Sequence, residues 1–181
     1  MSCDQAMPPL RVLTLKQPYA SLVALHLKQW ETRPHTITWD NYRGLTAIHA
    51  GAKSFVSSPD ETIELLSQEK GLPAELESFA ETAHLLPTSQ ILCITRVIHA
   101  QPMSSSMIDQ QSYLERCVGY WQIGRKAIQF TDTITLENPV SYVGMQGLTQ
   151  VKDVDLAQQL IDYWKTRFSF EIESHTQLTL W

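Results

Sequence analysis

A lysine, a glutamate and an arginine stand close together in the segment Lys28-Gln-Trp-Glu31-Thr-Arg33. Glu31 and Arg33 are two residues apart, so an extended backbone directs both side chains to the same face. A carboxylate and a guanidinium so placed can form a rigid ion pair or orient a third group, and the carboxylate of the pair can accept hydrogen bonds from a base edge. Lys28 would point the other way in a regular strand, so its convergence on Glu31 requires a turn at Lys28.

Two kinds of role are open for Lys28. Most lysines are solvated at the surface. If Lys28 is instead buried against an apolar wall, its pKa falls and the amine can act as a base. If it stays charged, it can hold a phosphate or polarise a carbonyl. We therefore expect Lys28 and Glu31 to be the catalytic residues if the protein is an enzyme, and to line a binding cleft otherwise.

Five further residues are candidates for contacting a nucleic acid. Gln17 and Tyr19 begin a predicted helix whose first N–H groups suit an anion, and Tyr19 could stack on a base or belong to the core. Arg43 precedes Gly44 and could contact a phosphate or serve the turn. His49 and Lys53 follow at the end of a predicted strand, where His49 could bind, titrate or satisfy a hydrogen bond in the core. The full nucleic-acid set is Gln17, Tyr19, Lys28, Glu31, Arg33, Arg43, His49 and Lys53.

The sequence contains no motif for a metal or a cofactor. Its histidines have no metal-ligand spacing, and the three cysteines (Cys3, Cys93 and Cys117) are scattered. No glycine-rich phosphate loop is present. Tyr120 and Trp121 remain as stacking candidates or as core residues. We expect neither a metal nor a cofactor.

Charge is segregated along a chain whose net charge is −5. Residues 11–53 carry six basic and two acidic side chains, whereas residues 58–88 carry seven acidic side chains and one basic one. A net negative charge argues against a broad basic surface that binds phosphates non-specifically. A local basic cleft is compatible with this distribution of charge.

Two observations concern the cellular compartment. No apolar run approaches the roughly 20 residues that span a bilayer. Residues 1–9 lack the basic and then hydrophobic layout of a signal peptide. We expect a cytoplasmic protein without membrane association.

The predicted elements alternate short strands with helices. A capping box with proline in the first turn, Ser58-Pro-Asp-Glu61, begins a helical insertion over 58–86. A regular βαβ alternation is missing, which favours one α+β domain over 1–181, a small β-barrel with flanking helices. Strands are expected at 11–15, 28–33, 36–39, 45–49, 90–99 and 126–136, a further one could begin at 140–143, and a final one is expected near 148–151. Helices are expected at 17–27, 108–117 and 153–168.

Three motifs in order resemble the activating signal cointegrator homology (ASCH) family of the PUA-like superfamily. They are Leu13-Thr-Leu-Lys-Gln-Pro-Tyr-Ala20, the segment from Lys28 to Arg33, and Tyr42-Arg-Gly44 with Ile48-His-Ala50 and Lys53. A weaker match covers Pro139 to Gly144 with Gly147-Leu148. The chain departs from the family pattern at His26, where the family has glycine, and at Thr149, where it often has tryptophan.

The resemblance implies a PUA-like barrel that binds RNA, another single-stranded nucleic acid or a nucleotide in a cleft beside the first helix. One branch of the family hydrolyses N-acetylated cytidine with a lysine, a threonine and a glutamate; its lysine falls on Lys28, and its threonine position falls on Glu31. Three functions therefore stay open: a binding module, a hydrolase (an amidohydrolase on an N-acylated nucleoside, or a nuclease), and a protein-interaction domain that uses the acidic segment 58–88. The sequence identifies no protein partner.

Overall fold

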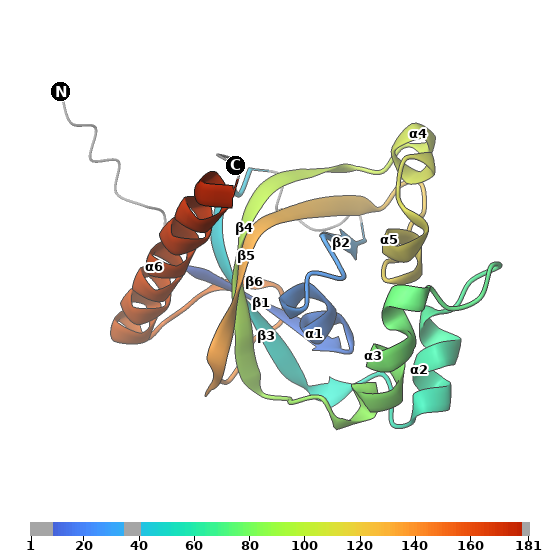
Figure 1. Cartoon of the computed structure of the whole chain (residues 1–181), viewed down its shortest axis with the longest axis horizontal. Helices are drawn as coiled ribbons and strands as arrows, with labels where there is room; N and C mark the ends of the chain where they lie inside the picture. Colours follow the sequence, from blue (N-terminus) through green and yellow to red (C-terminus); the bar gives the residue numbers. More distant parts are fainter. Residues whose placement is uncertain (1–8, 35–40, 179–181) are drawn as a thin grey trace.

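A computed structural model describes residues 9–34 and 41–178 of the chain. Its centre is a six-stranded mixed sheet with the order β2-β5-β4-β3-β1-β6, in which only the β1–β3 pair is parallel among the described strands (Figure 1). The predicted strand at 36–39 lies outside the described residues. The strands are β1 (Arg11–Gln17), β2 (Trp30–Arg33), β3 (Gly44–Ser54), β4 (Gln90–Pro102), β5 (Lys126–Ser141) and β6 (Leu148–Gln150).

Helices pack on both faces of this sheet, because its central strands are apolar on both faces. Leu13, Ile48 and Cys93 face α1 (Tyr19–Ala24). Their neighbours Val12 and Ala47 face the opposite side, where Leu160 and Trp164 of α6 (Val154–Leu178) cover them. Figure 1 shows α1 inside the curve of the sheet and α6 along its outer face. Helix α6 runs ten residues beyond the predicted end at 168.

The segment between β3 and β4 is helical and packs against α1. Ser58 caps α2 by accepting a hydrogen bond from Glu61 N at 3.2 Å, as the capping box predicts. Leu22 of α1 joins Leu66, Leu76 and Phe79 in one apolar cluster. The segment contains α2 (Pro59–Leu66), η1 (Ala74–Leu76), α3 (Glu77–Thr82) and η2 (Ala83–Leu85).

Residues 108–117 differ from the single helix that the sequence predicts. They belong to two short helices, α4 (Ser105–Asp109) and α5 (Tyr113–Cys117). Ser112 separates them by taking a non-helical conformation and accepting a hydrogen bond from Glu115 N at 3.0 Å. This N-cap starts α5 afresh and aims Glu115 at β2.

The prediction of a closed β-barrel is wrong for this chain. Among the described residues, β2 and β6 form the two ends of the sheet and do not pair with each other. Register shifts curve β4 and β5 strongly, but β2 has four residues and β6 three, which leaves little backbone for a closing ladder. A side chain spans the gap instead: Arg33 Nη2 donates to the carbonyl of Thr14 in β1 at 3.3 Å.

The lengths and polarity of the helices bear on the expectation that the protein has no membrane-spanning segment. Within residues 9–34 and 41–178, every helix is too short or too polar to cross a bilayer.

Candidate nucleotide-binding cleft

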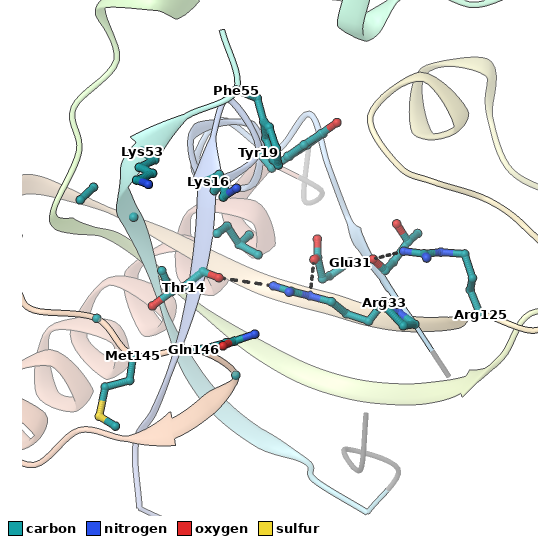
Figure 2. Close-up of a pocket in the computed structure, with 17 residues that line it drawn as sticks. Thr14, Lys16, Tyr19, Glu31, Arg33, Lys53, Phe55, Arg125, Met145 and Gln146 are labelled. Atoms are coloured by element: carbon teal, nitrogen blue, oxygen red, sulfur yellow. Dashed lines mark hydrogen bonds and ion pairs between the residues drawn. The ribbon is translucent and has the colours of Figure 1, made fainter. Parts of the chain in front are cut away.

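A cleft of about 580 Å³ lies inside the curve of the sheet (Figure 2). Because β1 and β3 are parallel, both reach it with their C-terminal ends. Strand β2 forms the opposite wall, and residues 144–147, which lead into β6, form a third side. The cleft is therefore assembled from segments that are far apart in the sequence.

Four basic side chains line this cleft, and Glu31 is the one carboxylate among the residues described there. Lys16 and Lys53 are exposed at the ends of β1 and β3. Arg33 and Arg125 lie on the side of β2, as Figure 2 shows. An acidic protein thus concentrates positive charge around one concave site, which favours an anionic ligand.

Two aromatic rings lie beside the lysines. Tyr19 and Phe55 meet edge to face, with their centroids 5.9 Å apart and their planes at 73°. Phe55 is 53% exposed, and Lys16 Nζ lies 4.4 Å from the centroid of its ring. Burial, and secondarily the carboxylate of Glu31, raises the pKa of Tyr19, so this phenol stays neutral at ordinary pH. The pair offers an uncharged flat surface next to cations.

Glu31 and Arg33 form the ion pair that their spacing predicts. Arg33 Nε lies 2.7 Å from Glu31 Oε1, and the side chains are 25% and 10% exposed, respectively. Arg33 also binds the carbonyl of Thr14. Both side chains line the cleft, so a short strand at the edge of the sheet presents a fixed carboxylate and a fixed guanidinium to a ligand.

Lys28 lies behind the cleft and does not line it. Its side chain is 1% exposed, and Nζ donates to the carbonyl of Val118 at 2.6 Å. Nζ is 3.8 Å from Glu31 Oε2 and 5.5 Å from the centroid of the Tyr19 ring. Burial lowers the pKa of Lys28, and the nearby carboxylates partly offset this effect. Lys28 thus supports Glu31 from behind.

A turn with an unusual backbone conformation brings Lys28 to Glu31. His26 has a φ of 60°, in the left-handed region where glycine is the least strained residue. The motif resemblance predicts glycine at this position, and the chain instead has histidine in a conformation that glycine adopts with little strain. The left-handed turn lets Lys28 precede β2 without pointing away from Glu31.

Glu115 is a neighbour of Lys28 and β2 that the sequence analysis missed. Its carboxylate accepts hydrogen bonds from Gln29 N at 3.0 Å and Trp30 N at 3.1 Å, where β2 begins. Burial raises its pKa, and the charge of Lys28 acts in the opposite direction. The motif Ser112-x-x-Glu115 has capping-box spacing and could have placed Glu115 in a first helical turn, although not against β2.

Besides Lys28, three further predicted binding residues lie outside the cleft lining. The amide of Gln17 is buried and donates to Ser21 Oγ at 2.8 Å and to the carbonyl of Pro87 at 2.7 Å. His49 is buried in β3, and burial lowers its pKa. Arg43 is exposed and donates to the carbonyl of Tyr42 at 2.7 Å. The structure brings together Tyr19, Glu31, Arg33 and Lys53 from the predicted set.

His49 still shapes the cleft indirectly. Its Nε2 donates to the carbonyl of Tyr142 at 2.9 Å, which leaves Nδ1 to accept from the hydroxyl of Thr14 at 3.1 Å. A Cβ atom on Gly144 would come within 2.2 Å of Nδ1. Glycine at this position therefore lets the segment that forms the third side of the cleft approach β1 and β3 closely.

The two other stacking candidates have different surroundings. Trp121 packs edge to face on Trp30, 6.1 Å between centroids, and donates from Nε1 to the carbonyl of Glu115. Tyr120 is 60% exposed, and the guanidinium of Arg125 lies 4.5 Å from its ring centroid. Tyr120 therefore contacts Arg125, a cation that lines the cleft. Trp121 instead packs against Trp30 of β2 and helps to hold Glu115 in place.

Comparison with solved structures identifies the fold. The chain is similar to the crystal structure of ASCH from Zymomonas mobilis, with a TM-score of 0.52, 12% sequence identity, and coverage of 85% of this chain and 94% of that chain. A mutant of the Zymomonas mobilis protein matches with a TM-score of 0.50, 10% identity, and coverage of 86% and 99%. No protein-family model and no curated protein matches the chain. The fold is therefore ASCH-like, as the motif resemblance predicts.

Proposed function

We propose that this ASCH-like chain binds single-stranded RNA, or a nucleotide from it, in the cleft between β1, β2 and β3. The exposed ammonium groups of Lys16 and Lys53 hold phosphates. Tyr19 and Phe55 supply the surface on which a base stacks. The motif resemblance implies a ligand of the same class.

One observation supports this proposal above all others: four basic side chains and an aromatic pair converge on one cleft in a chain of net charge −5. Cations alone would suit any anion, and aromatic rings alone would suit any apolar molecule. Together they match a ligand that alternates phosphates with flat rings, which is the composition of a nucleic-acid strand.

The size of the cleft favours a single strand over a duplex. A volume of about 580 Å³ lies within the range of small-ligand pockets. A duplex would instead require an extended basic face that follows two backbones. The cleft therefore accommodates one unstacked nucleotide and the phosphates next to it.

The hydrolase alternative finds less support in this arrangement. Lys28 and Glu31 are near each other, as that alternative requires, but Nζ of Lys28 donates to a carbonyl and is sealed from the cleft. A general base must come within hydrogen-bond reach of the water or substrate that it deprotonates. In this conformation Lys28 is better suited to holding Glu31.

The interaction-domain alternative rests on the acidic segment 58–88. That segment has exposed apolar residues, Ile63, Leu65 and Leu85, but no described feature indicates a partner. The cleft offers the more specific chemistry.

Binding of a fluorescent six-nucleotide RNA, measured by polarisation at low salt, tests the proposal. We expect the double variant Lys16→Ala/Lys53→Ala to bind at least about tenfold more weakly, because phosphate contacts dominate such binding. Lys165→Ala, which removes an exposed lysine of α6, is the matched control and should bind like the native chain. An equal decrease in the control, or binding unaffected by the double variant, would contradict the proposed site.

Chromatography of the same RNA and of N-acetylcytidine after incubation with the protein separates binding from hydrolysis. We expect both to be recovered intact. Turnover that disappears in Lys28→Ala while the variant stays folded would favour the hydrolase alternative.

A further inference from the structure

Among its described residues, the cleft contains one carboxylate, a hydrogen-bond acceptor whose negative charge repels phosphates. Glu31 presents a carboxylate among four cations, and its partners in residues 9–34 and 41–178 occupy only part of its capacity for hydrogen bonds. A carboxylate has about four lone-pair directions, whereas Arg33 Nε contacts one oxygen at 2.7 Å and Lys28 Nζ lies 3.8 Å from the other. Acceptor capacity therefore remains for a ligand.

The position of this carboxylate is fixed from several sides. Arg33 links it to β1 through the carbonyl of Thr14. Backbone pairing with Ile128 of β5 holds Glu31 in the sheet, and Glu115 fixes the start of β2. A preorganised acceptor of this kind discriminates between ligands, because it cannot move away from an unsuitable group.

We propose that Glu31 reads the Watson–Crick edge of the bound base and that the cleft selects guanine over uracil. This inference rests on the proposed function and names the base that the same cleft prefers. Guanine presents two adjacent donors, N1–H and the N2 amine, which together suit a carboxylate. Uracil presents one N–H between two carbonyl oxygens, both of which the carboxylate repels.

The neighbouring groups agree with this assignment. A phosphate placed against Glu31 would be repelled, so the carboxylate belongs to the part of the cleft that faces the base. Tyr19 lines the cleft near Glu31, because Lys28 Nζ lies 3.8 Å from Glu31 Oε2 and 5.5 Å from the centroid of the Tyr19 ring; this ring can stack on the same base. Cytosine and adenine have one amine next to a ring-nitrogen acceptor, so they rank between guanine and uracil.

Three RNAs of equal length and charge test the inference: hexauridylate, the same strand with one guanosine, and the same strand with one inosine. Inosine keeps N1–H and the carbonyl of guanine but lacks the N2 amine. We expect the guanosine strand to bind about tenfold or more tightly than hexauridylate, in the range of one good bidentate base contact. The inosine strand should fall between them.

Glu31→Gln provides the matching protein variant, since glutamine keeps the shape but offers one acceptor and one donor. We expect it to lower the preference for guanosine, measured as the ratio of the affinities of the two strands for the same variant, to about twofold or less. Inosine makes the same test without altering the protein, so a poorly folding variant leaves the inference testable.

Three outcomes would contradict this inference, and they differ in what they mean for the proposed function. Salt-sensitive binding of all three RNAs with equal affinity would overturn the guanine preference and leave the RNA-binding cleft standing. Failure of every RNA to bind would overturn both. A guanosine preference that persists in folded Glu31→Gln would exclude Glu31 as the group that reads the base.

Discussion

Lys28 Nζ and Glu31 Oε2 lie 3.8 Å apart, yet Glu31 lines the cleft and Lys28 does not. The lysine is the more deeply buried of the two, with 1% of its side chain exposed against 10% for the glutamate. In the proposed function the two residues therefore differ in role: Lys28 holds the carboxylate from behind, and Glu31 contacts the ligand.

Replacing Lys28 should therefore affect stability first. Lys28→Met leaves the carbonyl of Val118 without its donor and removes a cation close to Glu31. We expect the free energy of unfolding to fall by about 3 kcal/mol, as when one partner of a buried pair is removed. Urea denaturation measures it.

Lys53→Met is the matched control, since Lys53 is exposed; its effect should stay within about 0.5 kcal/mol. A native-like stability in Lys28→Met together with abolished RNA binding would show that Lys28 acts on the ligand directly.

His49 should make the fold sensitive to mild acid. Burial lowers the pKa of His49, so the unfolded chain takes up a proton at a higher pH than the folded chain does. Its contribution to stability is therefore complete above about pH 6.5 and decreases as the pH falls towards the folded pKa, by at most about 1.4 kcal/mol per pH unit.

Thermal unfolding of the native chain and of His49→Gln between pH 7 and pH 5 checks this prediction. The variant should show the shallower pH dependence, although it starts from a lower stability. His99→Gln removes an exposed histidine and should follow the native curve. Parallel curves for all three chains would mean that His49 does not titrate as its burial implies.

The sequence predicts the chemistry of β2 better than the shape of the cleft. Two-residue spacing is enough to place Glu31 and Arg33 on one face, since an extended backbone determines it locally. Lys16 and Phe55 were missed because their meeting depends on the parallel pairing of β1 with β3, in which Gln17 lies opposite Ser54. The register between strands that are far apart in the sequence cannot be inferred from the spacing of residues within either strand.

The barrel prediction failed for a related reason. Alternating apolar residues predict β5, but the shifts in its pairing with β4 and the shortness of β2 and β6 decide whether the sheet closes. Gln17 was predicted to bind a ligand because it lies at the start of a helix. In the structure its amide nitrogen already donates hydrogen bonds to Ser21 Oγ and to the carbonyl of Pro87.

Phe55 should matter for binding and hardly at all for folding. The ring is 53% exposed, so Phe55→Ala removes little buried surface. Removing the ring on which a base stacks should weaken RNA binding by about 1–3 kcal/mol. Polarisation measures it, and Leu85→Ala serves as control because Leu85 is an exposed apolar residue outside the cleft lining. Unchanged affinity in Phe55→Ala would show that the base does not stack on this ring.

The salt dependence of RNA binding tests the phosphate-binding cleft most directly. The logarithm of the affinity of the six-nucleotide RNA should fall linearly with the logarithm of the salt concentration. In Lys16→Ala/Lys53→Ala the slope should become shallower by about 0.7 for each phosphate that the variant no longer neutralises, and in Lys165→Ala it should stay unchanged. The same slope in the native chain and the double variant would show that the phosphates lie elsewhere and would contradict a nucleic-acid site in this cleft.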